Sequence, residues 1–415
     1  MGRRRGGRGR WFFLAVLLGA SAVLNLAAWN SEAFADAYVR RVFPLWSETY
    51  GRLTGLAPFS VGEVMIVLGV LWLIALMLTL AVTAVLSLCG AGKRLAGRER
   101  GGVDVSLAGG EHGDGKVLIA VRWRRFSARF TEATAWLLAA VLLVMTLNCF
   151  ILYQATGLTD GSKEWSEQER ALFYSKEQLA LLRDYIVEQA NVLAGEVPRN
   201  EAGEVVFQAD VREEAIAAMQ RLSQEYPQLS GYYPQPKGMA FSDLMSQSYM
   251  QGYYFPFSME ANYNTTMAQM NVPFTLCHEL SHLKGYIKED DANMLGFLAC
   301  IGSDDPAFVY SGYLGVLNYV NNDFYDSIGK NREVYASHVE ISALVKADNT
   351  FLTDDAWKKV EEKAIISTKT ARAASVTFTD TTLKVNGVSE GILSYNQVVE
   401  KLLAYYQEEE PLNRT

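Results

Sequence analysis

The stretch PFTLCHELSHLKGYIKEDDANMLGFLAC, residues 273–300, decides the fold and contains the most informative pattern of the chain. His278, Glu279 and His282 stand there in the order H-E-x-x-H. On a helix, residues four apart lie on one face, so two imidazoles at this spacing can reach one metal ion. Pro273 suits the first turn of such a helix and Gly285 suits its left-handed end.

This spacing predicts a site for one zinc ion. Where the motif binds zinc, both histidines are ligands and the glutamate takes a proton from water. A third protein ligand is needed, and Glu289, Asp290 and Asp291 open the next predicted helix. On spacing alone all three remain candidates. There are structural alternatives for both groups of residues. The H-E-x-x-H pattern can occur by chance, in which case the histidines belong to the core. The acidic residues can serve only to cap the helix that they begin.

Three apolar runs precede this region, at about residues 11–29, 61–88 and 135–153. Each is long enough to cross a bilayer as a helix. The first also resembles a secretory signal with a cleavage pattern ending at Ala35, but its length favours an uncleaved span. Residues 89–134 are Gly-rich and basic and are predicted to be a loop between the second and third runs, in which residues 109–115 look flexible.

Basic residues predict the orientation in the membrane. Lys and Arg number five before the first run, three in residues 30–59 and nine in residues 89–134. Because cytoplasmic segments are the basic ones, the N-terminus and residues 89–134 are expected in the cytoplasm. The sequence thus predicts a multi-pass plasma-membrane protein: an anchor, residues 1–153, and an extracytoplasmic domain, residues 154–415. Residues 30–59 predict a short amphipathic helix that lies on the membrane or packs on the protein.

Charge and cysteine content exclude some classes of protein. Residues 1–153 contain 17 Lys+Arg and 9 Asp+Glu, a net charge of +8, whereas residues 154–415 contain 21 and 37, a net of −16. So acidic a domain is a poor match for nucleic acid. Four cysteines, of which two lie at the ends of apolar runs, suggest no disulfide framework. Membrane lipid and a peptide or protein substrate remain as the expected partners.

The expected fold class is mainly α, with three N-terminal transmembrane helices and an α+β zincin-like domain. Residues 251–265 are the candidate strand edge that holds a substrate backbone, and Thr377–Val388 is expected to be extended. The candidate substrate-binding residues on that edge are Tyr254, Phe255, Glu260, Asn262 and Asn264. Tyr313 and His338, with Tyr310, are guesses for the donor that stabilises an oxyanion. Alternatively, the aromatic residues of the strand pack under the H-E-x-x-H helix, and His338 is an ordinary residue of a helix.

Several segments resemble a known family. They include Ser230–Pro234, Gly252–Phe257 running into Glu260–Asn264, the stretch Pro273–Cys300, and Ser303–Pro306. Over roughly residues 60–410 the chain is similar to an uncharacterised bacterial membrane family, domain of unknown function 3810, which is grouped with zinc-metallopeptidase-like proteins. The run Glu289–Asn293 resembles the E-x-x-A-N/D element of gluzincins. That resemblance implies His278, His282 and Glu289 as zinc ligands and Glu279 as the catalytic base. Position 291 departs from it, since Asp291 stands where a Glu is expected.

The resulting hypothesis is a membrane-anchored zinc metalloendopeptidase that hydrolyses peptide bonds of an envelope or extracellular protein. The alternative is an inactive membrane protein that binds peptides or envelope components, with a structural metal or none. A third reading is a scaffold in which H-E-x-x-H is accidental.

Overall fold

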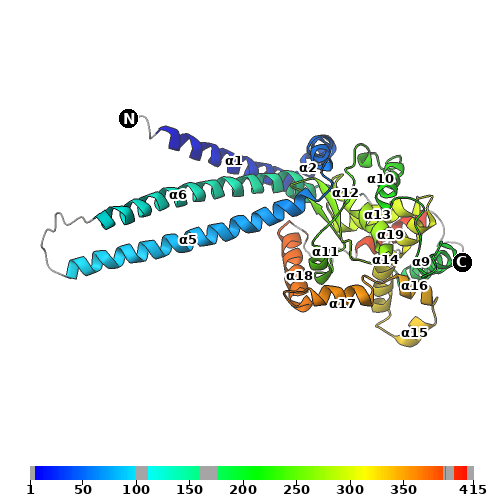
Figure 1. Cartoon of the computed structure of the whole chain (residues 1–415). Helices are drawn as coiled ribbons and strands as arrows, with labels where there is room; N and C mark the ends of the chain where they lie inside the picture. The colour runs from blue at the N-terminus through cyan, green and yellow to red at the C-terminus, as the bar shows by residue number, and fades with distance from the viewer. Residues whose placement is uncertain (1–4, 100–110, 159–174, 387, 389–396, 409–415) are drawn as a thin grey trace. The chain divides into compact units, whose positions relative to one another are not determined.

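The computed structural model describes residues 5–99, 111–158, 175–386, 388 and 397–408, which are mainly helical (Figure 1). The chain divides into two compact units. The first unit is Met1–Val23 with Glu63–Val144, and the second is Leu24–Gly62 with Met145–Thr415. The segment before the second apolar helix therefore belongs with the C-terminal part of the chain.

The first unit consists of long apolar helices, drawn from α1 (Arg5–Asn30), α5 (Val61–Glu99) and α6 (Glu111–Met145). Three helical segments are long and apolar enough to cross a membrane, namely Gly9–Asn30, Val61–Leu88 and Arg122–Tyr153. This confirms the prediction of three such helices and indicates a membrane protein.

Hydrogen bonds between side chains link α5 to α6 inside the first unit. The indole N–H of Trp72 donates to Thr134 Oγ1 at 3.1 Å, and that of Trp123 donates to Thr83 Oγ1 at 3.0 Å. In an apolar medium such bonds satisfy groups that have no water to bind. They fix the register of the two helices.

Most of the segment predicted as a loop at residues 89–134 is helical. Of the stretch 109–115 that was predicted to be flexible, residues 111–115 belong to α6, so the prediction is wrong there. Helix α5 continues to Glu99 and α6 begins at Glu111, while residues 100–110 lie outside the described part of the chain. The change from apolar to basic residues was taken as the end of the helix. Basic residues are good helix formers, so a helix can continue past the point where its composition changes.

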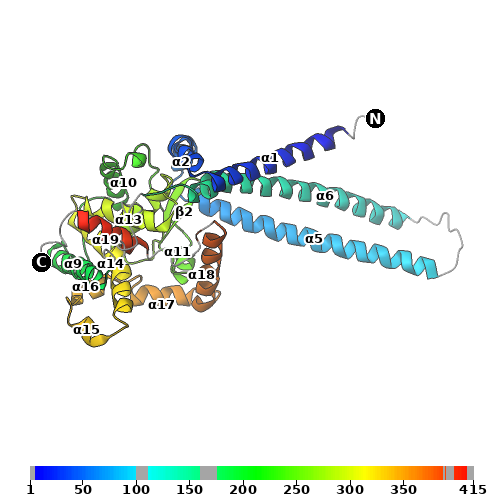
Figure 2. The ribbon, with the colours of Figure 1, turned by 180° about the vertical axis from the view of Figure 1, so that it is seen from behind.

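The second unit contains most of the short elements. Its helices are α2 (Glu32–Arg41), α3 (Pro44–Trp46), η1 (Ser47–Gly51), α4 (Arg52–Gly55), η2 (Thr146–Phe150), α7 (Ile151–Tyr153), α9 (Lys176–Glu196), α10 (Val211–Leu222), η4 (Pro227–Leu229), α11 (Ser242–Gln247), η5 (Gln269–Asn271), α12 (Val272–His282), α13 (Glu289–Ile301), α14 (Pro306–Ser327), α15 (Arg332–Ala336), α16 (Ala343–Asp348), α17 (Asp354–Glu362), α18 (Thr368–Val385) and α19 (Val398–Glu408). Figure 2 shows α19 beside α13 from behind, and the two helices are in contact.

A small sheet lies against α12. Its strands are β1 (Lys237–Gly238), β2 (Gly252–Phe255) and β3 (Glu260–Tyr263), in the order β1-β3-β2. β3 is parallel to β1 and antiparallel to β2, with Tyr254 opposite Ala261. β3 is thus the central strand, and β2 is an outer strand that contacts α12.

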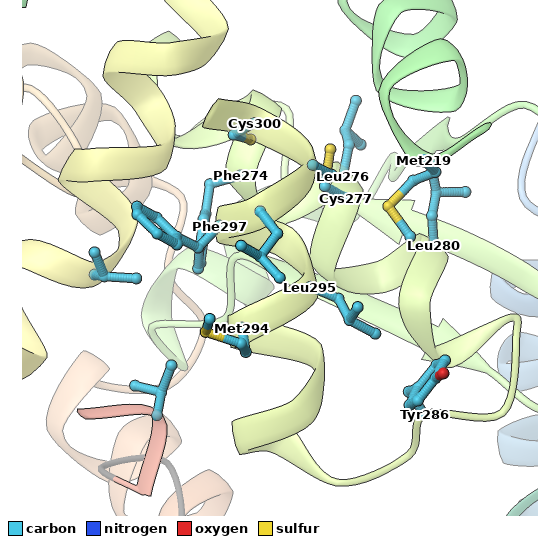
Figure 3. Packing of buried hydrophobic residues seen from close by; sticks show 14 of the residues in the cluster. Met219, Phe274, Leu276, Cys277, Leu280, Tyr286, Met294, Leu295, Phe297 and Cys300 are labelled. Atoms are coloured by element: carbon cyan, nitrogen blue, oxygen red, sulfur yellow. The ribbon is translucent and has the colours of Figure 1, made fainter. Parts of the chain in front are cut away.

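The core of the second unit forms where α12 and α13 pack on each other and on α10 and α14. Figure 3 shows Leu276 and Leu280 of α12 near Met219 of α10, with Leu295 and Phe297 on α13. All five side chains are fully buried. Burial of this apolar surface is the main force that holds the two helices together.

The extended segment predicted at Thr377–Val388 is also wrong, because α18 is helical through Val385. The segment contains the β-branched residues Thr377, Thr381 and Thr382, a residue type enriched in strands. In the helix, the Thr377 and Thr381 hydroxyls donate to the carbonyls four residues earlier, at 2.8 and 2.7 Å. These bonds offset the low helix propensity of threonine.

A buried ion pair joins the sheet to the start of α5. Glu260 pairs with Lys237, and both side chains are buried. The Glu260 carboxylate also accepts from the backbone N–H groups of Val61 and Gly62, at 3.2 and 2.8 Å. Those N–H groups open a helix and have no partner within it, so Glu260 acts as a distant cap.

Glu260→Ala is expected to lower the free energy of unfolding by about 3–5 kcal/mol, because it leaves the Lys237 charge buried without a partner. Urea unfolding of the full-length chain in detergent, followed by tryptophan fluorescence, measures the change. The control is Glu340→Ala, whose side chain is 86% exposed beside Lys346 and whose loss should cost less than about 0.5 kcal/mol. Equal stability of the two variants would contradict the structural role of Glu260.

Candidate metal centre

Helix α12 presents its histidines at its C-terminal end. It runs from Val272 to His282, with Pro273 in the first turn as predicted. Gly285 follows with φ +92°, a left-handed conformation that lets the chain turn at once toward α13. His278 and His282 therefore lie on the last turn, facing the first turn of α13.

Close contact between α12 and α13 depends on Gly296. A Cβ at this position would lie 3.2 Å from the backbone nitrogen of His278 and 3.4 Å from the carbonyl oxygen of Phe274. Only a glycine lets the helix backbones approach so closely without adjustment. The approach brings the first turns of α13 opposite His278.

Three ligand-type atoms converge between the two helices. The Nε2 atoms of His278 and His282 are 3.1 Å apart. Glu289 Oε2 lies 3.1 Å from the first and 3.8 Å from the second. All three atoms lie within 4.8 Å of one another, and the side chains are buried or nearly so.

Hydrogen bonds at the far side of each ring fix the ring orientation. His282 Nδ1 is 2.7 Å from the carbonyl oxygen of Tyr286, and His278 Nδ1 is 2.9 Å from Asn293 Oδ1. A carbonyl oxygen only accepts, so each Nδ1 must bear the proton. In neutral rings both Nε2 atoms then present lone pairs to each other across 3.1 Å. Such an arrangement requires a positive charge between them, either a proton or a metal ion.

The pKa shifts of the two histidines indicate which ring takes up a proton when no metal ion lies between them. Burial lowers the pKa of His282 to about 4, so this ring is neutral at pH 7. Burial also acts to lower the pKa of His278, but the hydrogen bond and charge of Glu289 outweigh it and raise the pKa. A proton on His278 is therefore the alternative to a metal.

The donor set fits zinc. Two imidazole nitrogens and one carboxylate oxygen form a known ligand set of catalytic zinc. Zinc bonds of 2.0–2.1 Å at tetrahedral angles place ligand atoms about 3.3 Å apart. The three separations here, 3.1, 3.1 and 3.8 Å, lie around that value. Outward hydrogen bonds from both Nδ1 atoms are also what metal-binding histidines normally make.

Glu279 lies between α12 and β2. It is only 5% exposed, and burial, first among the causes, raises its pKa to about 8. The backbone N–H of Tyr254 donates to it, whereas its Oε2 accepts no hydrogen bond among the described residues. Gly252 of β2 makes room for it, since a Cβ there would stand 2.4 Å from Glu279 Oε1. Glu279 thus retains an acceptor oxygen without a partner, beside the histidines.

The two other candidate ligands belong to a separate ion pair. Lys401 of α19 pairs with Asp291 and with Asp290, the latter at 3.2 Å. Burial acts to lower the pKa of Lys401, but the two carboxylates outweigh it and raise the pKa. The structure therefore brings Glu289 to the histidines and directs Asp290 and Asp291 to α19.

The predicted substrate-binding side chains lie in the core and not on an exposed edge. Glu260 is in the ion pair with Lys237, and Asn264 donates to Ser246 Oγ at 2.9 Å. Asn262 donates to the carbonyl of Tyr253, Tyr254 donates to that of Asn148, and Phe255 packs on Gly62. They were candidates because a strand edge was expected to hold a substrate backbone, whereas their polar side chains bond to neighbouring segments of the protein.

The guessed oxyanion donors are not part of the cluster. Tyr313 lies beside tyrosines 185 and 406 and packs on Phe297, while Tyr310 donates to Asp348. His338 Nδ1 lies 2.8 Å from Asp184 Oδ2.

Sequence reasoning missed three residues around the cluster. Asn293 holds His278 and could have been found, because it lies four residues after Glu289 on the same helix face. Tyr253 and Tyr319 come from β2 and α14. Burial, and then the charges of neighbouring groups that include Glu279, raise the pKa of Tyr253 to about 12. Burial and then Glu289 raise the pKa of Tyr319 to about 12, against the effect of Asn293. Both hydroxyls are therefore protonated donors near the site, and no local pattern marks them.

Comparison with known proteins gives one match. A family model described as "Protein of unknown function (DUF3810)" matches residues 115–403, more than half of the chain, and the chain belongs to this family. The match confirms the predicted family, although it begins within α6 and not near residue 60. No curated protein and no solved structure matches. The family description names no activity, so function has to be argued from the site.

Asn293→Ala is expected to weaken zinc binding 10–100-fold, because His278 loses the acceptor that orients its ring. Competition of the purified protein with a zinc chelator measures the affinity. The control is Asn318→Ala, which removes a side-chain pair with Asn349 on the exposed side of α14. An Asn293→Ala variant that binds zinc as the control does would show that Asn293 does not orient a ligand.

Proposed function

We propose that this member of the DUF3810 family is a membrane-anchored zinc metallopeptidase with a zincin-like domain. It would hydrolyse peptide bonds of a protein or peptide in the cell envelope. The observation that supports this most strongly is the convergence of His278 Nε2, His282 Nε2 and Glu289 Oε2, with a buried glutamate beside them. Neither a helix cap nor a pair of core histidines requires two lone pairs to face each other.

Each residue has a defined role in this proposal. The two Nε2 atoms and the Glu289 carboxylate hold one zinc ion, and Asn293 and the Tyr286 carbonyl orient the rings. Bound zinc supplies Lewis-acid chemistry, which lowers the pKa of water and polarises a carbonyl. The positive charge of a bound zinc ion would keep the Glu279 carboxyl ionised despite its burial. Glu279 Oε2 could then take a proton from the attacking water and return it to the nitrogen of the peptide bond that breaks.

In this proposal, β2 and two tyrosines bind the substrate. β2 is the outer strand next to α12, so its backbone is the edge along which an extended peptide can pair. Tyr253 is 37% exposed on this strand. It and Tyr319 are the candidate donors to the oxygen that gains charge as the peptide carbonyl is attacked.

The proposed orientation has the N-terminus in the cytoplasm and residues 154–415 outside. Three crossings require that residues 31–60 and the chain after the third span lie on one side of the membrane. The packing of Leu24–Gly62 with Met145–Thr415 in one compact unit agrees with this requirement. The proposed peptidase domain therefore includes residues before the second span.

A second candidate is an inactive protein that binds peptides or envelope components around a structural metal. The burial of Glu279 and His282 favours it, because substrate and water must reach a catalytic centre. Glu279 Oε2 favours catalysis, because it accepts no hydrogen bond among the described residues. A purely structural site would not require a buried acceptor without a partner.

The purified full-length protein is expected to contain about one zinc per chain. The His278→Ala/His282→Ala variant should lose the metal, whereas His338→Ala should keep it, because His338 pairs with Asp184 elsewhere in the fold. Elemental analysis after removal of loosely bound metal measures the content. Wild-type protein that stays metal-free after zinc is supplied would rule out the peptidase.

Glu279→Gln should retain zinc and lose at least about 100-fold in hydrolysis, since the amide cannot take up the proton. Cells that express wild type or Glu279→Gln are compared by sequencing of new protein N-termini in the envelope. Cleavage present in wild type only supports catalysis by Glu279. Identical N-termini in both strains, with zinc bound in both, would favour the structural metal.

A further inference from the structure

Residues 42–59 expose several large apolar side chains. Their buried side holds Phe43 and, along the helical turns that follow, the small or polar residues Ser47, Gly51 and Thr54. The opposite side bears large apolar residues that are exposed: Leu45 by 58%, Leu53 by 64%, Leu56 by 81% and Phe59 by 56%. We call these four residues the outer face. An ordinary surface helix turns most of its large apolar residues toward the core.

The inner side fits tightly onto the turn between β2 and β3. Thr54 Oγ1 donates to the carbonyl of Ser258 at 2.7 Å, and Lys237 donates to the carbonyl of Thr54 at 2.8 Å. A Cβ at Gly51 would lie 3.6 Å from that of Met259. The helix cannot roll over to bury its leucines without losing these contacts.

The outer face lies next to helix ends that meet the membrane. Phe59 is two residues before Val61, where the second apolar span begins. The first span ends at Asn30, before the same segment. Arg40 and Arg41 of α2 are exposed beside it and suit anionic lipid headgroups. A segment with both ends at a bilayer and an exposed apolar face has the lipid as its nearest apolar partner.

The candidate metal centre lies close to the same helix ends. Phe255, at the end of β2, packs on Gly62, and the Asn148 side chain donates to the carbonyl of Pro256 at 2.8 Å. Gly252, which contacts Glu279, is three residues from Phe255, or about 10 Å along a strand. The strand thus leads from the start of a span to the proposed base.

We propose that the outer face is embedded in the bilayer interface, so that the candidate site opens at the membrane surface. Its substrates are then polypeptide segments held close to the membrane, such as the parts of other membrane proteins that adjoin their spans. The substrate class rests on the proposed peptidase function. The embedding of the outer face does not, because it requires neither metal nor catalysis.

Depth in the bilayer can be measured at single cysteines with an environment-sensitive fluorophore. The full-length protein, with Cys89→Ser, enters nanodiscs of phosphatidylcholine and phosphatidylglycerol that contain a spin-labelled quencher lipid. Cys149, Cys277 and Cys300 are buried and can stay. The probes are Leu53→Cys and Leu56→Cys on the outer face and Tyr253→Cys on β2. The control is Leu344→Cys, an exposed leucine of α16.

Quenching should be strongest at positions 53 and 56, several-fold above position 344, and intermediate at position 253. Equal quenching at 56 and 344 would overturn the embedding. Shielding of position 56 from a water-soluble quencher without quenching by the lipid would assign the face to a protein, such as a second copy, and would overturn it too. Quenching at 253 no greater than at 344 would overturn the location of the site.

The substrate class is tested by mapping the positions of the cleavage sites that depend on Glu279. New N-termini that disappear in Glu279→Gln should fall within about ten residues of membrane spans in other proteins. Cleavage confined to soluble envelope proteins would overturn the substrate class and leave the peptidase intact. An absence of any cleavage dependent on Glu279 would instead overturn the peptidase, whatever the depth measurement shows.

Discussion

The close approach of α12 and α13 is the constraint on which the centre depends. Gly296 lets the two backbones nearly touch at His278. With the helices at this distance, Glu289 reaches the Nε2 atoms and Asn293 reaches the far side of the same ring. A larger separation would leave the histidines on one helix and the acid on another, without a common point. The apolar faces of α12 and α13 hold this approach, so the same packing that makes the core also makes the centre.

The part of the site that follows helix geometry could be predicted from sequence. His278, Glu279 and His282 share one helix, and Glu289 opens the next, so local spacing was sufficient to bring them forward as candidates. Asp290 and Asp291 could not be set apart from Glu289 in this way. Their separation depends on Lys401, which lies 110 residues after Asp291 and has no local signature. Tyr253 and Tyr319 were missed for the same reason.

The errors in the fold have a related cause. Glu260, Asn262 and Asn264 were chosen because they lie on the strand expected to hold a substrate, but each side chain is buried and bonds to polar or charged groups of the interior. Helices α5 and α6 outlast their apolar segments, and α18 is helical despite its β-branched residues. In each case, contacts or hydrogen bonds determine the burial or the secondary structure, and local composition does not reveal them.

The ion pair of Lys401 with Asp290 and Asp291 has a consequence for biogenesis. The ribosome delivers α12 and α13 long before it delivers α19. Until then, the two carboxylates next to Glu289 lack the charge of Lys401, and Asp291 has only the weaker attraction of Lys288, so a buried position is less favourable for them. The first turn of α13 is therefore less stable until residue 401 has emerged. A nascent chain would have its apolar helices complete while the cluster of His278, His282 and Glu289 is still unassembled, so the candidate metal centre forms late in synthesis.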